Sequence, residues 1–591
     1  MRQFFKFMFA SMLGVFLSII LLFFIFAIIV SAIVSSVSVD EKVKVTSGTI
    51  LHMEFKAPLR DRSSENPFAN LDFSSLSSGS QPGLNDIIKN IEKAADDNNI
   101  SGIYLDLAGL QGGFAAIEEI RNALLEFKKS KKFIYAYSDY YSQSSYYLAS
   151  VSDQVWMNPE GVVDLRGFSA QMPFMKGMFE KLEIEPQVIR HGKFKSAIEP
   201  LILEKMSDEN REQVATYMNA LWNHYISKVA VSRKIEATQL QTIADSVLSR
   251  TTEDALRLKL IDKSGYKDQF LSDLKSLSDK SAGDDLVMVT LKKYTRAPRS
   301  GTEKEFTRDK IAVIYASGNI VGGKGNSDEI GSESLSETIR KAREDEKVKA
   351  VVLRVNSPGG DALASEVIWR EMDLCRKVKP VIVSMGDVAA SGGYYISCAA
   401  DTIIAQPNTI TGSIGVFGVL FNVQKLFNNK LGITFDGYET APFADLGTPF
   451  RALTEPEKQI IQQSVERVYT TFTTRVADGR NMPINNVDSI GQGRVWAGSD
   501  ALRLGLVDML GGLDDAIAVA AEKAQLDNYR ISELPEQKDA FKQIMEEIAG
   551  DMETRWIKYK LGSNYNLFES YRSVSNLQGI QARSFVDFQL R

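Results

Sequence analysis

Two stretches of the chain decide its fold: DYYSQSSYYLASVSD at residues 139–153 and DVAASGGYYISCAAD at residues 387–401. They align without a gap, 248 residues apart, and further matches keep nearly the same offset on either side. Among these, DALRLKLID at 254–262 and DALRLGLVD at 500–508 share seven of nine residues. Matches that recur in the same order at a fixed offset mark a repeated structural unit. The chain is therefore expected to contain two homologous domains.

The repeat sets the domain boundaries. We predict one domain at residues 46–298 and the second at 308–536, joined by a polar, charged linker. Residues 537–591 have no counterpart in the first half, and we expect them to form a helical tail.

Strand and helix patterns alternate in each half. In the second half, KIAVIYAS is a continuous apolar run typical of a strand buried on both faces. The pattern predicts strands at 310–317, 349–355 and 380–386 and helices at 334–345 and 365–378. This order predicts an α/β fold with a parallel sheet covered by helices, and a functional site at the carboxyl ends of the strands.

The composition excludes several classes of protein. With 69 basic and 75 acidic residues, the net charge is -6, so the basic excess of a nucleic-acid-binding protein is absent. Two Cys and three His exclude a disulfide framework and argue against a zinc hydrolase. We expect no metal ion and no cofactor. Acid–base chemistry must therefore use carboxylates, Lys or one isolated His.

The N-terminus is predicted to be a membrane anchor. Residues 7–39 contain no charged residue, and about 20 apolar residues suffice to span a bilayer. A cleaved signal peptide with a long apolar region is the alternative. Residues 1–6 carry Arg2 and Lys6, so they are expected to stay in the cytoplasm as a short tip. Everything after residue 40 is then expected to be exported, which in a Gram-negative cell means into the periplasm.

The two Cys could pair in an exported protein. Cys398 lies in an apolar stretch and Cys375 in a helix pattern. We therefore favour two buried free thiols over a disulfide.

Two glycine-containing loops follow adjacent strands of the second half, NSPGG at 356–360 and AASGG at 389–393. Glycines after a strand let backbone N–H groups point into a cleft, and a helix N-terminus adds positive potential. These loops could form an oxyanion hole with Ser391 at its rim. The alternative is a helix-capping Ser with glycines that allow close packing.

Comparison of the two halves favours a composite site. Gln143 stands opposite Ser391, so the first half lacks the nucleophile. In a looser alignment of 191–200 with 441–450, Lys195 stands opposite Ala444, so the second half lacks that amine. Each half has lost what the other keeps, which suggests one site built from Ser391 and Lys195.

A Ser–Lys pair requires a neutral amine. A lysine with the usual pKa of about 10.4 is only about 0.04% neutral at pH 7. Burial lowers this pKa, and the apolar neighbours Phe194, Ala197 and Ile198 fit such burial. Ser413 in TGSIG is a candidate for orienting the amine. The alternatives are a surface Lys195 and an ordinary turn Ser.

NSPGG, ASGGYYIS, TGSIGVFG and GRVWAGSDALRLGLVDMLGG together resemble the signal peptide peptidase A (protease IV) family, in its double-length, membrane-anchored form. The resemblance implies tandem crotonase/Clp-protease-like domains. It implies Ser391 as nucleophile, Lys195 of KSAIEP as general base and Ser413 as the residue that orients Lys195. Gly359 or Gly360, together with Gly392, would supply the oxyanion hole.

The resemblance also implies a biological role. Such enzymes are homotetramers on the outer face of the inner membrane, where they degrade residual signal peptides after release from preproteins. Their substrates would be apolar, extended peptides, with small or aliphatic residues expected next to the cut.

Three other functions remain open at this stage. A serine hydrolase could use His191, four residues before Lys195. A crotonase-like enzyme could use the same oxyanion hole on an acyl-CoA thioester, although export would separate it from CoA. A catalytically inactive membrane scaffold is the non-enzymatic alternative.

Overall fold

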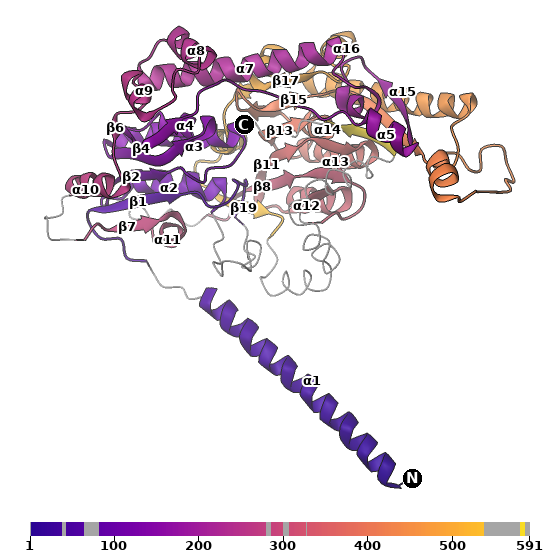
Figure 1. Cartoon of the computed structure of the whole chain (residues 1–591), viewed down its shortest axis with the longest axis horizontal. Coiled ribbons are helices and arrows are strands. Elements are labelled where there is room, and N and C mark those ends of the chain that lie inside the picture. Colours follow the sequence, from indigo (N-terminus) through magenta and orange to yellow (C-terminus); the bar gives the residue numbers. More distant parts are fainter. Residues whose placement is uncertain are drawn as a thin grey trace.

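The computed structural model describes residues 2–37, 43–63, 82–278, 285–299, 307–326, 328–536 and 579–584. The two halves of the chain lie side by side, and a long N-terminal helix extends away from them (Figure 1). Residues 38 and 39 of the predicted anchor at 7–39, and most of the predicted tail, lie outside the described residues.

The first half is built on a parallel sheet of six strands. Its spatial order is β7-β1-β2-β3-β4-β6, and every neighbouring pair is parallel. The strands are β1 (Thr49–Glu54), β2 (Ile100–Asp106), β3 (Phe133–Tyr141), β4 (Gln154–Val163), β6 (Lys263–Ser264) and β7 (Met288–Thr290).

The second half repeats this arrangement. Its corresponding order is β19-β8-β11-β13-β14-β18, again parallel throughout. The equivalent positions of the strands confirm the predicted tandem repeat and parallel sheets. These strands are β8 (Lys310–Ser317), β11 (Val348–Ser357), β13 (Val381–Ala390), β14 (Thr402–Ala405), β18 (Met509–Leu510) and β19 (Arg530–Leu534), while β15 (Ile410–Gly412) and β17 (Val495–Ala497) extend the sheet beside β13.

Both faces of the second sheet are buried. Along β8, Ala312 and Ile314 pack into one apolar core, and Ile311 and Val313 pack into another on the opposite face. Successive side chains of a strand point to opposite faces, so a strand covered on both sides must be apolar throughout.

Most of the helices cover the two parallel sheets, whereas α5 and α6 pack against a third sheet described below, and α15 also contacts that sheet. In the first half the helices are α2 (Leu84–Asp96), α3 (Phe114–Phe127), α4 (Gln143–Ala149), α5 (Lys176–Leu182), α6 (Glu199–Ile202), α7 (Asp208–Arg233), α8 (Ala237–Asp245), α9 (Thr252–Arg257), α10 (Lys267–Leu277) and α11 (Leu291–Thr295). In the second half they are α12 (Ser332–Glu344), α13 (Ala362–Arg376), α14 (Gly392–Ser397), α15 (Glu455–Arg480), α16 (Ile484–Ile490), α17 (Gly498–Arg503) and α18 (Leu513–Lys523). Helix α7 runs across both halves (Figure 1).

A third sheet joins the two halves. Its order is β10-β9-β12-β20-β16-β5. Strand β5 (Glu185–His191) belongs to the first half in sequence but pairs antiparallel with β16 (Val416–Asn422) of the second. The remaining strands are β9 (Asn319–Val321), β10 (Glu329–Gly331), β12 (Gly359–Asp361) and β20 (Gly579–Arg583). The third sheet therefore holds a strand of the first half and strands of the second half together.

In residues 579–584, the part of the tail that the structure describes, the expectation of a helix is wrong. Strand β20 (Gly579–Arg583) is extended and pairs antiparallel with β12 on one side and β16 on the other. Pairing with two strand edges satisfies its backbone groups more fully than an isolated short helix would.

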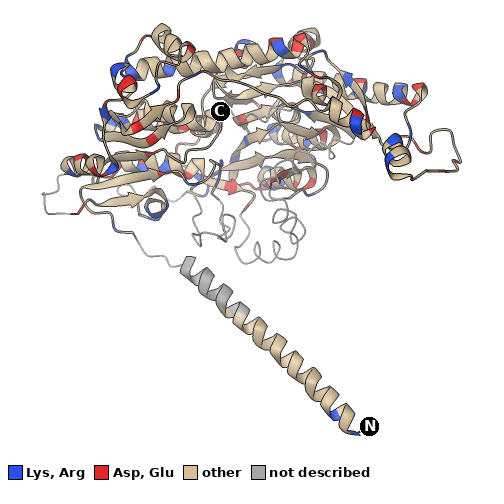
Figure 2. Ribbon diagram, viewed as in Figure 1, with Lys and Arg blue, Asp and Glu red and all other residues tan. Residues whose placement is uncertain are grey.

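The N-terminal helix α1 (Arg2–Val37) contains a stretch, Arg2–Ile25, with mean hydropathy 2.6 that is not buried in the protein. Charged residues are spread over both halves (Figure 2). In the sequence of α1, by contrast, the charged residues are Arg2 and Lys6, near its start. Its length and composition would allow it to cross a membrane, which fits membrane anchoring.

Candidate active site

Lys195 and Ser391 meet inside one chain. The Nζ atom of Lys195 lies 2.8 Å from the Oγ atom of Ser391. Both side chains are almost completely buried, with Lys195 1% and Ser391 0% exposed. The structure thus brings together the two residues that the comparison of the halves singled out.

Ser391 sits at a strained junction between strand and helix. It follows β13 directly and is the N-cap residue of α14, with a φ of 54°. Its N–H donates to the carbonyl of Gly412 at 2.8 Å, and its own carbonyl accepts from the N–H of Tyr395. A non-glycine residue with positive φ is uncommon, and such strain concentrates at functional sites.

Lys195 is delivered by the strand that crosses between the halves. It lies four residues after β5, and the N–H of Phe194 donates to the carbonyl of Gln492 in the second half. The amide of Gln213, on α7, donates to the Phe194 carbonyl and to Ser196 Oγ, and it accepts from the N–H of Val495. One buried amide therefore fixes both sides of Lys195 to the second half.

Ser413 is the second hydroxyl beside the amine. Its Oγ lies 3.1 Å from Lys195 Nζ, and its carbonyl oxygen lies 3.3 Å away. Its N–H donates to the carbonyl of Arg494 at 2.7 Å, which fixes its backbone. Ser413 thus has the geometry of a group that orients the amine.

Burial lowers the pKa of Lys195 well below its ordinary value. The cause is desolvation, which disfavours the charged ammonium. The amine lies 5.9 Å from the centre of the buried Phe417 ring. A neutral amine in hydrogen-bond contact with a hydroxyl can accept its proton.

The predicted glycines lie around the same point. A Cβ on Gly359, whose φ is 97°, would lie 2.5 Å from the Gly392 nitrogen, so the two backbones are in close contact. The N–H of Gly359 donates to Ser357 Oγ at 3.1 Å. Gly360 pairs with Ile320 and Ala582 within the third sheet.

A small cavity of about 20 Å³ adjoins the amine. It is lined by side chains from α7, by the Lys195 segment and by Ser413 and Ser584. The described tail therefore reaches the site.

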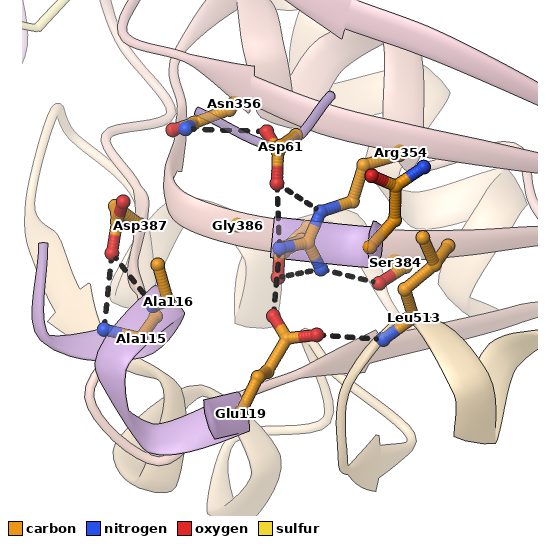
Figure 3. A network of polar contacts seen from close by, with 12 residues as sticks. Asp61, Ala115, Ala116, Glu119, Arg354, Asn356, Ser384, Gly386, Asp387 and Leu513 are labelled. Carbon is orange, nitrogen blue, oxygen red and sulfur yellow. Dashed lines mark hydrogen bonds and ion pairs between the residues drawn. The ribbon is translucent and has the colours of Figure 1, made fainter. Parts of the chain in front are cut away.

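A buried network of charged side chains links the two halves of the chain. Arg354 on β11 lies between Asp61 and Glu119 of the first half, with ion-pair distances of 2.8 and 2.7 Å (Figure 3). Burial would lower the pKa of Arg354, but the two carboxylates raise it above its ordinary value. Arg354 also donates to Ser384 Oγ at 2.8 Å.

Asp387 makes a second connection. Its carboxylate accepts from the N–H groups of Ala115 and Ala116 at 3.0 and 3.1 Å, at the start of α3 (Figure 3). The N-cap residue of α3, Gly113, has no side chain to cap the helix, so a carboxylate from the other half does so. No sequence pattern pointed to Arg354, Asp387 or Gln213 as part of the site.

The remaining candidates from the sequence, His191 and the two Cys, do not contact Ser391 Oγ, and the position in the first half that corresponds to Ser391 holds Gln143. His191 stacks on Tyr469, with 3.9 Å between ring centres, and an amine rather than an imidazole lies beside Ser391 Oγ. In the first half, the Gln143 side chain bonds to the backbone of Arg166 and Gly167. Cys375 and Cys398 are buried and free, as expected, and burial raises the pKa of their thiols to about 11 and about 12.

Comparison with known proteins assigns the family. The model of Peptidase family S49 matches residues 126–281 and 373–527, one copy in each half. Protease 4 of Salmonella typhi is 39% identical over 478 residues, which cover 79% of this chain and 76% of that protein. The chain belongs to peptidase family S49.

Other relatives of this S49 peptidase agree. The chloroplastic serine protease SPPA of Arabidopsis thaliana is 36% identical over 82% of this chain and 70% of its own length. Protease 4 of Haemophilus influenzae is 36% identical over 74% and 72%. A Clp protease model also matches residues 302–411. The chain is thus a serine protease with two S49 domains in tandem and a Clp-protease-like fold.

Proposed function

We propose that this S49 protease is an endopeptidase with Ser391 as nucleophile and Lys195 as general base. This proposal rests on the 2.8 Å distance between Lys195 Nζ and Ser391 Oγ in a buried site. Ser413 orients the amine through its hydroxyl. The tandem repeat keeps one functional pair because each half supplies one member.

The reaction proceeds through an acyl-enzyme. Neutral Lys195 takes the proton from Ser391 Oγ as Oγ bonds to the peptide carbonyl carbon. Backbone N–H groups among Gly359, Gly360 and Gly392 stabilise the oxyanion. The C–N bond then breaks, and Lys195 returns the proton to the leaving amine. A water molecule next gives a proton to Lys195 and attacks the acyl carbon. The bond between this carbon and Ser391 Oγ then breaks, and Lys195 passes the proton to Oγ, which restores Ser391 and releases the acid product.

We propose that the substrates are residual signal peptides left after their release from preproteins. These are apolar and extended, and an extended peptide can pair with strand edges of the kind that β12 and β16 offer to β20. A membrane-anchored enzyme meets them by diffusion in two dimensions. Purified protein is expected to cut apolar peptides faster than charged peptides of the same length, and equal rates would refute this substrate class.

We further propose a place and an assembly for the enzyme. Residues 7–39 anchor it in the inner membrane, with both halves in the periplasm. Several large apolar residues at 431–446 are exposed, including Leu431 at 57% and Tyr438 at 91%. They support a homotetramer, because exposed apolar groups that gather in one segment favour contact with another copy. Light scattering on detergent-solubilised protein tests the assembly, and a monomer would refute it.

Single substitutions test the roles of the residues. Ser391→Ala and Lys195→Met are each expected to lower kcat by at least about a thousandfold. His191→Ala is expected to keep activity close to that of the unsubstituted enzyme. Loss of activity in the His191 variant alone would instead support a Ser–His hydrolase. Full activity in the Ser391 variant would refute the serine mechanism.

A further inference from the structure

Strand β20 occupies a slot one strand wide. Its Ala582 pairs with Gly360 of β12, and its Gln581 pairs with Phe417 of β16. Neighbouring strands lie about 4.8 Å apart, so β12 and β16 stand about 9.6 Å apart. Without β20, both edges would present unpaired N–H and C=O groups to an extended peptide.

This slot leads directly to the reacting groups. The carbonyl oxygen of Ala582 lies so near the glycine loops that a Cβ on Gly359 would be 2.2 Å from it, and one on Gly392 would be 3.0 Å from it. The N–H of Ser584 donates to the carbonyl of Pro358 at 2.7 Å. Ser584 also lines the cavity beside Lys195. The strand therefore covers the approach to Ser391.

The side chains of the strand suit the slot. Ala582 is 0% exposed, Ser584 5% and Gln581 6%, while Arg583 is less buried. Side chains alternate along a strand, so positions 582 and 584 share one face, and both residues on that face are small. The slot thus accepts an extended peptide with small residues at two positions two apart.

We propose that Gly579–Ser584 is a resident strand that competes with peptide substrates for this slot. A substrate binds only when β20 leaves, so its apparent affinity is reduced by the fraction of molecules in which the slot is open. A tethered segment competes at a high effective concentration, which makes it effective even when its own contacts are few. This inference depends on the proposed function in one respect: it takes the slot between β12 and β16 to be the place where the peptide substrate binds.

Binding measurements test this without relying on catalysis. In a Ser391→Ala background, a chain ending at residue 578 is compared with one ending at residue 584, which keeps β20. The probe is a fluorescein-labelled peptide of sequence GIQARS, measured by polarisation. The shorter chain is expected to bind the probe at least tenfold more tightly. Equal binding, or binding by neither chain, would overturn the proposal.

Kinetics give a second readout with the full-length chain. Ala582→Trp cannot fit a fully buried position, so it should expel β20 and lower KM for an apolar peptide at least fivefold. The chain ending at residue 584 should keep the KM of the full chain. An unchanged KM for the Trp variant would overturn the proposal. If no variant cuts peptides but the binding difference persists, the proposed function fails while the resident strand stands.

A second inference comes from the network between the halves. Arg354 lies three residues before Ser357 on β11, and Asp387 lies four residues before Ser391 on β13. Each is tied to the first half, which also delivers Lys195. We infer that Arg354 and Asp387 are positioning residues that hold the Ser391 loop and the glycine loop in register with Lys195.

The test separates positioning from simple stability. Arg354→Met is expected to lower kcat at least tenfold, leave KM within about threefold and shift the acid limb of the pH profile of kcat/KM. The matched control is Arg340→Met, which breaks the 2.6 Å pair with Glu371 inside the second half and should keep kcat. Asp387→Asn is the second variant if Arg354→Met does not fold. Variants that melt earlier but keep both kcat and the pH profile would overturn the inference.

Discussion

The backbone of Gly493 lies directly against Lys195. A Cβ at position 493 would be 2.6 Å from both the Cα and the Cβ of Lys195, and the φ of Gly493 is +82°. Lys195, whose amine lies beside Ser391, thus packs directly against a glycine of the second half. This contact makes the composite site sensitive to one methyl group.

Gly493→Ala is expected to lower kcat by about a hundredfold or more. The added methyl must push Lys195 away, and small misplacements of a catalytic group cost about this much. It also introduces a left-handed backbone strain of about 1–2 kcal/mol. Steady-state kinetics together with thermal unfolding separate the two effects.

Gly505→Ala is the matched control for that strain. Gly505 has a φ of +76°, and a Cβ there would meet only the Met482 side chain, at 3.9 Å. This variant should lose a similar amount of stability and keep its activity. If both variants keep full activity, close packing against Lys195 is not required for catalysis.

Lys195 is expected to reduce stability at neutral pH. Burial lowers its pKa in the folded state, so the unfolded chain binds more protons between that lowered pKa and the ordinary value of 10.5. The free energy of unfolding therefore rises with pH across this window. Each unit by which the pKa is lowered corresponds to about 1.4 kcal/mol.

Lys195→Met should consequently unfold at a higher temperature than the unsubstituted protein at pH 7, although it is inactive. The advantage should shrink as the pH approaches 10.5. In the active enzyme, kcat/KM should rise with pH through the lowered pKa of Lys195, because only the neutral amine accepts a proton. A Met variant that is less stable at pH 7 would contradict a desolvated amine.

Ser413→Ala is expected to lower kcat about tenfold to a hundredfold with little change in KM. The hydroxyl 3.1 Å from Nζ orients the amine, and its loss leaves the amine less well directed at Ser391. Ser413 has a φ of 52°, so Ser413→Gly serves as the control that relieves backbone strain. Equal loss in both variants assigns the effect to the hydroxyl, whereas recovery in the Gly variant would assign it to the backbone.

Local patterns predicted much of this architecture. The apolar run KIAVIYAS forms β8 at the predicted residues 310–317, because a strand buried on both faces has a continuous apolar sequence. The proximity of Ser391 and Lys195 was also predictable, because equivalent positions of the two repeats can be compared with each other. A residue lost in one copy and kept in the other points to a shared site.

Contacts between distant, short segments were not predictable. Strand β20 has five residues, and its partner strands lie far away in the sequence. A segment this short shows no hydrophobic periodicity from which a strand could be predicted. Arg354 stands in an otherwise apolar strand, and its partners Asp61 and Glu119 are 293 and 235 residues away. A buried charge is stable only when such partners are present, and sequence alone does not pair them.

Gln213 provides the final test of how Lys195 is held. Its buried amide bonds to the Phe194 carbonyl at 3.1 Å, to Ser196 Oγ at 2.7 Å and to the Val495 N–H at 3.2 Å. Gln213→Leu keeps the approximate volume but leaves these groups without that partner. The expected cost is about 1–3 kcal/mol of stability for each buried group left unsatisfied.

The same change should lower kcat at least tenfold, because the segment that carries Lys195 loses its attachment to β17. Gln241→Leu is the matched control, since Gln241 accepts from Trp222 at 2.7 Å within the first half and does not touch the Lys195 segment. Chemical denaturation and kinetics on both variants distinguish the effects. If the Gln213 variant lost stability alone, as the control should, the amide would be a structural bond and not a support for the catalytic amine.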